Sequence, residues 1–194
     1  MTERITSTAL PTKYGKFKLY LYNETGSGKE HLALVCGDIS NSNQPIPARI
    51  HSSCLTGDVF GSLRCDCQEQ LHRSMELFQK WQCGVLIYLE QEGRGIGLTN
   101  KIKAYVLQDQ GLDTVEANEK LGFAPDERDF GVAAYILKDL NINCVRLLTN
   151  HPLKIAELEK AGIRVNREPF WVKENKYNHN YLTTKQNKMG HLSK

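Results

Sequence analysis

Three cysteines lie close together in the segment CLTGDVFGSLRCDC, which begins at Cys54 and ends at Cys67. Cys65 and Cys67 are two residues apart, so both thiols point to the same side of an extended segment. A loop over residues 57–64 would bring Cys54 alongside them. Three thiolates with one open position suit a catalytic zinc, which keeps water as its fourth ligand and lowers the pKa of that water toward about 7. The alternative is a set of buried core thiols, which the polar residues around them disfavour.

A glycine-rich segment, QEGRGIG at 91–97, follows the strongly apolar stretch GVLIYLE. Glycines between a strand and a helix let backbone amides approach phosphate oxygens at the helix N-terminus. The spacing matches neither the dinucleotide-binding motif nor the P-loop, so a plain tight turn is the alternative. Glu92 and Arg94 favour a ligand, because a carboxylate can accept from a guanine-like edge and an arginine can hold a phosphate with two donors.

Two further segments place polar residues at the ends of predicted elements. In PDERDF, Asp126 and Arg128 lie at the start of a predicted helix. The aspartate there either caps the helix or takes part in catalysis. In LLTNHPLK, Thr149 ends a strand and Lys154 lies in the first turn of the next helix. Strand ends at such crossovers bind ligands in open α/β sheets. A lysine is unfavourable near a helix N-terminus, so an anion is a plausible partner for Lys154. The alternative is that Lys154 is simply solvated.

Basic residues are spread over all of these segments. His51 is either a fourth metal ligand or a polar residue that ends a strand. If they converge, the following residues would neutralise a polyphosphate: Arg49, His51, Arg64, Arg94, Lys101, Arg128 and Lys154.

Periodicity predicts a mixed α/β fold that positions these segments, with a β-rich N-terminal part followed by alternating β/α units. Strands are predicted at 16–22, 31–36, 46–51, 84–90, 144–148 and 163–166, and helices at 66–82, 98–110, 126–141 and 151–161. Residues 1–172 would form a single catalytic domain, and the polar residues 173–194 a solvated tail.

Composition excludes several classes of protein. The chain has 194 residues, a net charge of +3 and 40% hydrophobic residues, which argues against a disordered chain, a fibre and a dedicated nucleic-acid binder. No apolar run approaches the length of about 20 residues that a bilayer requires, and no secretory signal is visible at the N-terminus. Six cysteines without an export signal are typical of reduced thiols or metal ligands, so we expect a cytoplasmic protein.

Together, these segments resemble GTP cyclohydrolase II, the first committed enzyme of riboflavin biosynthesis. The resemblance runs over nearly the whole chain, through RIHSSCLTGDVFGSLRCDCQEQL, QEGRGIGLTNKIKAYVLQDQGLDTVEAN, LGFAPDERDFGVAAYIL and LLTNHPLK to YLTTKQNKMGHL. It implies zinc-dependent hydrolytic opening of the guanine imidazole ring of GTP, with release of formate and pyrophosphate. The implied product is 2,5-diamino-6-hydroxy-4-(5-phosphoribosylamino)pyrimidine. Magnesium would accompany the triphosphate, and the protein would be a homodimer without a nucleic-acid or membrane partner.

The resemblance also implies roles for individual residues. Cys54, Cys65 and Cys67 would hold the zinc. Arg128 would be the nucleophile that attacks the α phosphate, Asp126 its base, and Tyr105 a neighbour of the ring being opened. The expected GTP contacts are Arg49, Ile50, His51, Ser52, Ser53, Gln70, Glu92, Gly93, Arg94, Thr114, Thr149 and Lys154.

Two positions depart from the family pattern, since Ser53 stands where glutamate is common and His151 where asparagine is common. The change at Ser53 leaves open a non-catalytic or altered-specificity nucleotide-binding paralogue. A zinc-dependent nucleobase deaminase is disfavoured, because the H-x-E and P-C-x-x-C motifs are missing. A purely structural zinc protein would leave PDERDF and QEGRGIG unexplained. Fused relatives carry a dihydroxybutanone phosphate synthase ahead of this domain, whereas this chain, starting about fifteen residues before its first predicted strand, is expected to be monofunctional.

Overall fold

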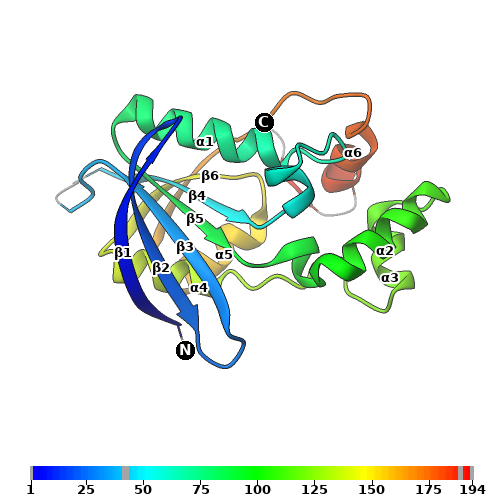
Figure 1. The fold of residues 1–194 in the computed structure, drawn as a ribbon, viewed down its shortest axis with the longest axis horizontal. Helices are drawn as coiled ribbons and strands as arrows, with labels where there is room; N and C mark the ends of the chain where they lie inside the picture. Colours follow the sequence, from blue (N-terminus) through cyan, green and yellow to red (C-terminus); the bar gives the residue numbers. More distant parts are fainter. Residues whose placement is uncertain (1, 41–43, 188–189, 193–194) are drawn as a thin grey trace.

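A computed structural model describes residues 2–40, 44–187 and 190–192, which form a mixed α/β fold around one seven-stranded sheet (Figure 1). The sheet order is β1-β2-β3-β5-β4-β6-β7, antiparallel from β1 to β5 and parallel from β5 to β7. The predicted fold class is therefore confirmed. The strands are β1 (Thr2–Thr12), β2 (Gly15–Glu24), β3 (Lys29–Cys36), β4 (Ile46–Ser52), β5 (Gly84–Leu89), β6 (Cys144–Leu148) and β7 (Arg164–Glu168).

The first strand, β1, escaped the sequence analysis. Its sequence, TERITSTALPT, is mostly polar, and most of its side chains are exposed, so it shows no apolar alternation. The strand is held by its antiparallel register with β2, from Thr2 opposite Glu24 to Thr12 opposite Gly15. The first strand therefore begins at Thr2, and the expectation of about fifteen residues before the first strand is wrong.

The helices follow the predicted periodicity with two differences. The helix expected over 126–141 begins only at Gly131, so Asp126 caps no helix. Residues 126–130 instead form a non-helical segment, in which the Glu127 amide donates to the Arg94 carbonyl. A short helix that was not predicted begins after the Asp113 capping box. The helices are α1 (Cys67–Trp81), α2 (Gly97–Asp109), α3 (Thr114–Lys120), α4 (Gly131–Asp139), α5 (Pro152–Lys160) and α6 (His179–Asn187), with a π turn at Leu55–Val59 and a 3-10 turn at Glu92–Gly95.

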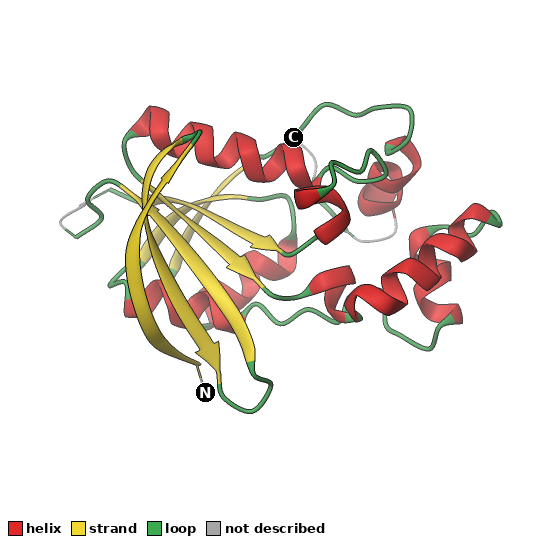
Figure 2. Ribbon diagram, viewed as in Figure 1, coloured by secondary structure: helices red, strands yellow, loops and turns green. Residues whose placement is uncertain are grey.

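Helices cover both faces of the sheet (Figure 2). On one face α1 packs Met75 and Phe78 against Leu86 of β5, and Phe78 is fully buried. On the other face α4 contributes Ile136 and Leu137 to a larger apolar cluster with the alternate residues of β3 and β5. The crossovers β4–α1–β5 and β5–α4–β6 therefore lie on opposite faces, with β4 between the other two strands.

The carboxyl ends of β4, β5 and β6 meet at one edge of the sheet, because these strands are parallel. Cys54 follows β4 by two residues, Glu92 follows β5, and Thr149 follows β6. Ligands bind at such edges of open α/β sheets. Beyond this edge α2 and α3 project away from the sheet (Figure 1). The fold therefore brings the cysteine, glycine and LLTNHPLK segments together.

The C-terminal residues differ from the predicted solvated tail. They form α6, which contacts α3, and they bury Asn178 and Thr184. Composition could not show this, because the segment is polar throughout and has little helical amphipathicity. None of the helices in the described part of the chain has the length and apolar character that crossing a membrane requires.

Candidate active site

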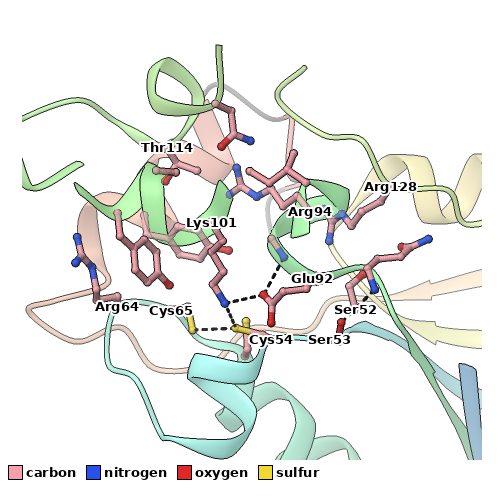
Figure 3. Close-up of a pocket in the computed structure, with 18 of the residues that line it drawn as sticks. Ser52, Ser53, Cys54, Arg64, Cys65, Glu92, Arg94, Lys101, Thr114 and Arg128 are labelled. Carbon is pink, nitrogen blue, oxygen red and sulfur yellow. Dashed lines mark hydrogen bonds and ion pairs between the residues drawn. The ribbon is translucent and has the colours of Figure 1, made fainter. Parts of the chain in front are cut away.

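The three predicted cysteines converge beyond the end of β4. Figure 3 shows two of them, Cys54 and Cys65, facing each other. Their sulfur atoms all lie within 4.8 Å of one another, and Cys54 Sγ is 3.8 Å from Cys65 Sγ. Tetrahedral zinc with Zn–S bonds of about 2.3 Å holds its sulfurs about 3.8 Å apart, so this donor set fits zinc. Hydrogen bonds from the Cys65 and Cys67 thiols, with Lys101 alongside, lower the pKa of Cys54, and the cluster raises the pKa of Cys65 to about 11.

Gly57 packs its backbone directly against this cluster. A Cβ atom at position 57 would lie 2.8 Å from Cys65 Sγ and 3.0 Å from Cys54 Sγ, closer than side chains tolerate. The π turn Leu55–Val59 that carries Gly57 therefore needs a glycine where it faces the sulfurs.

Replacement of Gly57 by alanine is expected to weaken zinc binding by about 10-fold or more, since the new methyl group must displace at least one sulfur. Competition with a chromophoric chelator measures the zinc Kd. Gly131→Ala is the matched control, because a Cβ there meets only the Asp129 carboxylate, no closer than 3.1 Å. Equal zinc affinity in the Gly57 variant and the wild type would refute this placement of the turn.

His51 does not join the cysteine group. Its Nε2 lies 3.1 Å from both carboxylate oxygens of Asp58, and its ring stacks on Tyr88. Burial lowers the pKa of His51 more strongly than Asp58 raises it, so the ring is neutral near pH 7. Asp58 also accepts from the Cys54 amide and from the Tyr88 hydroxyl. Asp58 thereby fixes the start of the metal-site turn, a role that the sequence analysis missed.

Glu92 is engaged within the protein. Its carboxylate accepts from the backbone amides of Leu55 and Gly93 and from Lys101 Nζ, at 2.6–2.8 Å. Burial lowers the pKa of Lys101, but its hydrogen bonds to Glu92 and Cys54 outweigh this and raise the pKa above its ordinary value. The expected contact of Glu92 with a guanine edge stays a prediction.

Arg94 occupies a strained position that points to an anion. Gly93 and Arg94 have left-handed φ values of 63° and 62°, and such backbone strain in a non-glycine residue gathers at functional sites. Both terminal guanidinium nitrogens of Arg94 are buried without a hydrogen-bond partner in the described part of the chain. Buried donors of this kind call for an acceptor, such as a phosphate oxygen.

Arg128 and Asp126 form an ion pair in which both side chains are mostly buried, at 12% and 11% exposed. Arg128 donates from Nε and Nη2 to the two oxygens of Asp126, at 2.8 and 2.6 Å. His151 Nε2 lies 3.0 Å from both Asp126 Oδ2 and Arg128 Nη2. Burial, with Arg128 and Lys154 nearby, lowers the pKa of His151 to about 4, so this ring is neutral at pH 7. Burial would raise the pKa of Asp126, but hydrogen bonds from Arg128 and His151 hold it well below its usual range.

Most of the basic residues that the sequence analysis grouped lie together in the structure. Arg49, His51, Arg94, Arg128 and Lys154 line one pocket, whereas Arg64 and Lys101 line the adjoining cysteine pocket. The two pockets share Ser52, Cys67, Arg94, Arg128 and Tyr181.

Of the remaining predicted contacts, Ile50 is buried in the apolar core and lines neither pocket, and Gly93 lines the cysteine pocket. The others fall into two groups. Ser52, Ser53, Tyr105 and Thr114 line the cysteine pocket, and Gln70 and Thr149 line the basic pocket. Several side chains already bond within the protein: Ser53 Oγ accepts from the Gln91 amide, Gln70 joins Arg49 to Asp66, and Lys154 donates to the Ile50 carbonyl.

Sequence reasoning missed several lining residues. Asn118 lies on the unpredicted α3, and Tyr181 and His191 belong to the predicted tail. The Asp113 capping box was a signal for the first. The resemblance through YLTTKQNKMGHL was a signal for the other two, although the composition of the polar tail was not.

Comparison with known proteins adds an independent line of evidence. A family model described as GTP cyclohydrolase II matches residues 3–169. GTP cyclohydrolase-2 of Buchnera aphidicola is 56% identical over 189 residues, which cover 97% of each chain. GTP cyclohydrolase-2 of Actinobacillus succinogenes is 54% identical over 97% of this chain and 87% of the relative. Riboflavin biosynthesis protein RibBA of Bacillus subtilis is 53% identical over 99% of this chain, which spans only 48% of that relative's length.

Proposed function

The chain belongs to the GTP cyclohydrolase II family, and we propose that it opens the guanine imidazole ring of GTP, releasing formate and pyrophosphate. The product would be 2,5-diamino-6-hydroxy-4-(5-phosphoribosylamino)pyrimidine, in the first step of riboflavin biosynthesis. One observation carries the proposal beyond the family. The pocket that holds the three cysteines adjoins the basic pocket, and Arg94 and Arg128 line both of them. One ligand with a base at one end and a triphosphate at the other suits this arrangement.

At the phosphate end, Arg49, Arg94, Arg128 and Lys154 would bind the triphosphate together with magnesium. Arg128 would attack the α phosphate through a guanidinium nitrogen. A nitrogen–phosphorus bond forms, the bond to pyrophosphate breaks, and the proton passes to Asp126 Oδ2, which lies 2.6 Å from Arg128 Nη2. Water later cleaves the nitrogen–phosphorus bond and leaves the 5′-phosphate of the product.

At the base end, Glu92, Tyr105 and Thr114 would orient the guanine beside the cysteines. When bound to the three thiolates, zinc would supply a hydrolytic nucleophile at neutral pH by lowering the pKa of a water molecule to about 7. Position 53 would contribute through its backbone, because the Ser53 hydroxyl already accepts from the Gln91 amide.

Incubation with GTP, zinc and magnesium tests the proposed activity, with formate, pyrophosphate and the pyrimidine measured separately. We expect one formate and one pyrophosphate per pyrimidine formed. Saturable GTP binding without any of these products would instead establish the alternative, a non-catalytic nucleotide-binding paralogue.

We also propose that the protein works as a homodimer in the cytoplasm, with residues 1–172 as the catalytic domain and 173–194 as a C-terminal tail. Exposed apolar side chains support the dimer. Val59 and Phe60 are 64% and 75% exposed beside the π turn. Leu98, Ile102 and Val106 are also exposed, and their spacing of four residues puts them on one side of α2. Residues of both groups line one surface hollow.

Light scattering at assay concentrations is expected to give a mass of about 44 kDa, twice the 22.0 kDa of the chain. Ile102→Glu should shift the mass toward the monomer, because a buried carboxylate at an apolar interface is costly. Tyr135→Glu is the control, being comparably exposed but on α4. A monomeric wild type would show that the dimer proposal is wrong.

A further inference from the structure

Lys101 is a buried lysine to which the proposed reaction gives no role. It lies on the first turns of α2, with its side chain only 10% exposed. Its Nζ donates to Cys54 Sγ at 3.1 Å and to Glu92 Oε1 at 2.8 Å (Figure 3). Lysine is seldom fully buried unless paired, so both contacts call for an explanation.

The carboxylate partner fixes where the ammonium points. Glu92 is held by the Leu55 and Gly93 amides, and its Oε1 receives both the Gly93 amide and Lys101. The glycine turn also packs closely on α2, since a Cβ at position 93 would lie 3.0 Å from Lys101 Cβ. Backbone and side-chain contacts together hold Nζ against the sulfur.

The net charge expected at the metal site explains why the Lys101 ammonium would be useful beside it. Three thiolates and one divalent zinc carry a net charge of −1 in a buried place, which is unfavourable without a nearby cation. A hydrogen bond to a metal-bound thiolate withdraws electron density from the sulfur, so the metal keeps more positive charge.

We propose that Lys101 is a positioning residue that acts through Cys54: its ammonium, held against Cys54 Sγ by Glu92, offsets the negative charge of a three-cysteine metal site and so strengthens metal binding. This inference rests on the proposed zinc site. If Lys101 had only a structural role, holding α2 to Glu92, its replacement would change neither the zinc affinity nor the cobalt spectrum.

The test compares Lys101→Met with Lys103→Met, which removes the same charge from an exposed position on the same helix. The zinc Kd is measured by chelator competition, and the Co²⁺-loaded proteins are compared by absorption. We expect Lys101→Met to raise the zinc Kd 10- to 100-fold, in the usual range for residues behind a metal ligand. Its sulfur-to-cobalt charge-transfer band should move to longer wavelength, because the sulfur lone pairs lose a hydrogen bond. Lys103→Met should match the wild type in both measurements.

Wild-type zinc affinity and an unchanged cobalt band in a folded Lys101→Met would overturn the proposal. If that variant does not fold, Lys101→Gln, which keeps a polar side chain but removes the charge, is measured in the same way. A weakened zinc affinity there supports the proposal, and wild-type affinity overturns it. A wild type that binds no zinc would instead remove the proposed metal site, so the two failures are distinguishable.

Discussion

Replacement of Arg128 by alanine is expected to abolish release of both pyrophosphate and formate, with kcat lowered roughly a thousandfold or more, or about 4 kcal/mol in activation free energy. If the phosphoryl step comes first and anchors the base, ring opening cannot proceed without it. The substitution also leaves the buried Asp126 carboxylate without its bidentate partner. Separate assays of the two products, with circular dichroism as the check on folding, measure the effect.

Arg128→Lys distinguishes a nucleophile from a phosphate clamp. Burial lowers the pKa of Arg128, but the ion pair with Asp126 outweighs this effect and raises the pKa above its ordinary value, so the guanidinium is protonated. A nucleophilic Arg128 would therefore have to give a proton to Asp126 before attack. A lysine keeps the charge and loses the two-pronged contact, so a nucleophilic role predicts loss of kcat. A clamp predicts near-native kcat with a raised KM.

Arg94→Lys is the matched comparison for this test. Arg94 lines the same pocket with two buried, unpartnered nitrogens, and we assign it phosphate binding alone. It should therefore show the raised KM of a clamp. If Arg128→Lys behaves like Arg94→Lys, the nucleophile assignment is wrong.

Elements with a one-sided apolar pattern were predictable from the sequence. The helix α1 turns Met75 and Phe78 toward the core, so its period of 3.6 residues is visible in the chain. The polar and apolar residues of β2 alternate visibly, although its buried Phe17 and Tyr22 belong to the apolar clusters on opposite faces of the sheet. Elements held by other forces were not predictable. The strand β1 is held by backbone pairing, and the segment before α4 by its contacts with Arg94 and His151.

The candidate site also combines features that were predictable from the sequence with features that were not. Chemistry that is local in sequence, such as the Cys65–Cys67 pair or the Asp126–Arg128 pair, was visible as a motif. Contacts that depend on the packing of distant elements were not. Lys101 meets Cys54 across 47 positions of the chain, and His151 meets Asp126 across 25. Asp126 was a candidate helix cap in the sequence, and only the structure shows that its carboxylate bonds to Arg128 and the distant His151 instead.

Replacement of Cys65 by serine is expected to remove zinc and to reduce formate release about a thousandfold, because metal assistance contributes several kcal/mol to hydrolysis. A serine hydroxyl is a poor substitute for a soft thiolate ligand. The fold should persist, since Cys65 lies at the sheet edge and outside the two main apolar clusters. Metal analysis and circular dichroism check these two expectations.

Pyrophosphate release should survive in part in the same variant, because different residues would hold the two ends of GTP in the proposed binding mode. Arg94, Arg128 and Lys154 line the phosphate end, and none of them contacts Cys65 through a hydrogen bond described here. Cys144→Ser is the matched control, since Cys144 lies on β6, outside the cysteine cluster, and this variant should keep zinc and both products. Full zinc occupancy in Cys65→Ser would contradict the ligand assignment. Complete loss of pyrophosphate release in a folded Cys65→Ser would show that breaking the phosphate bond depends on the metal site.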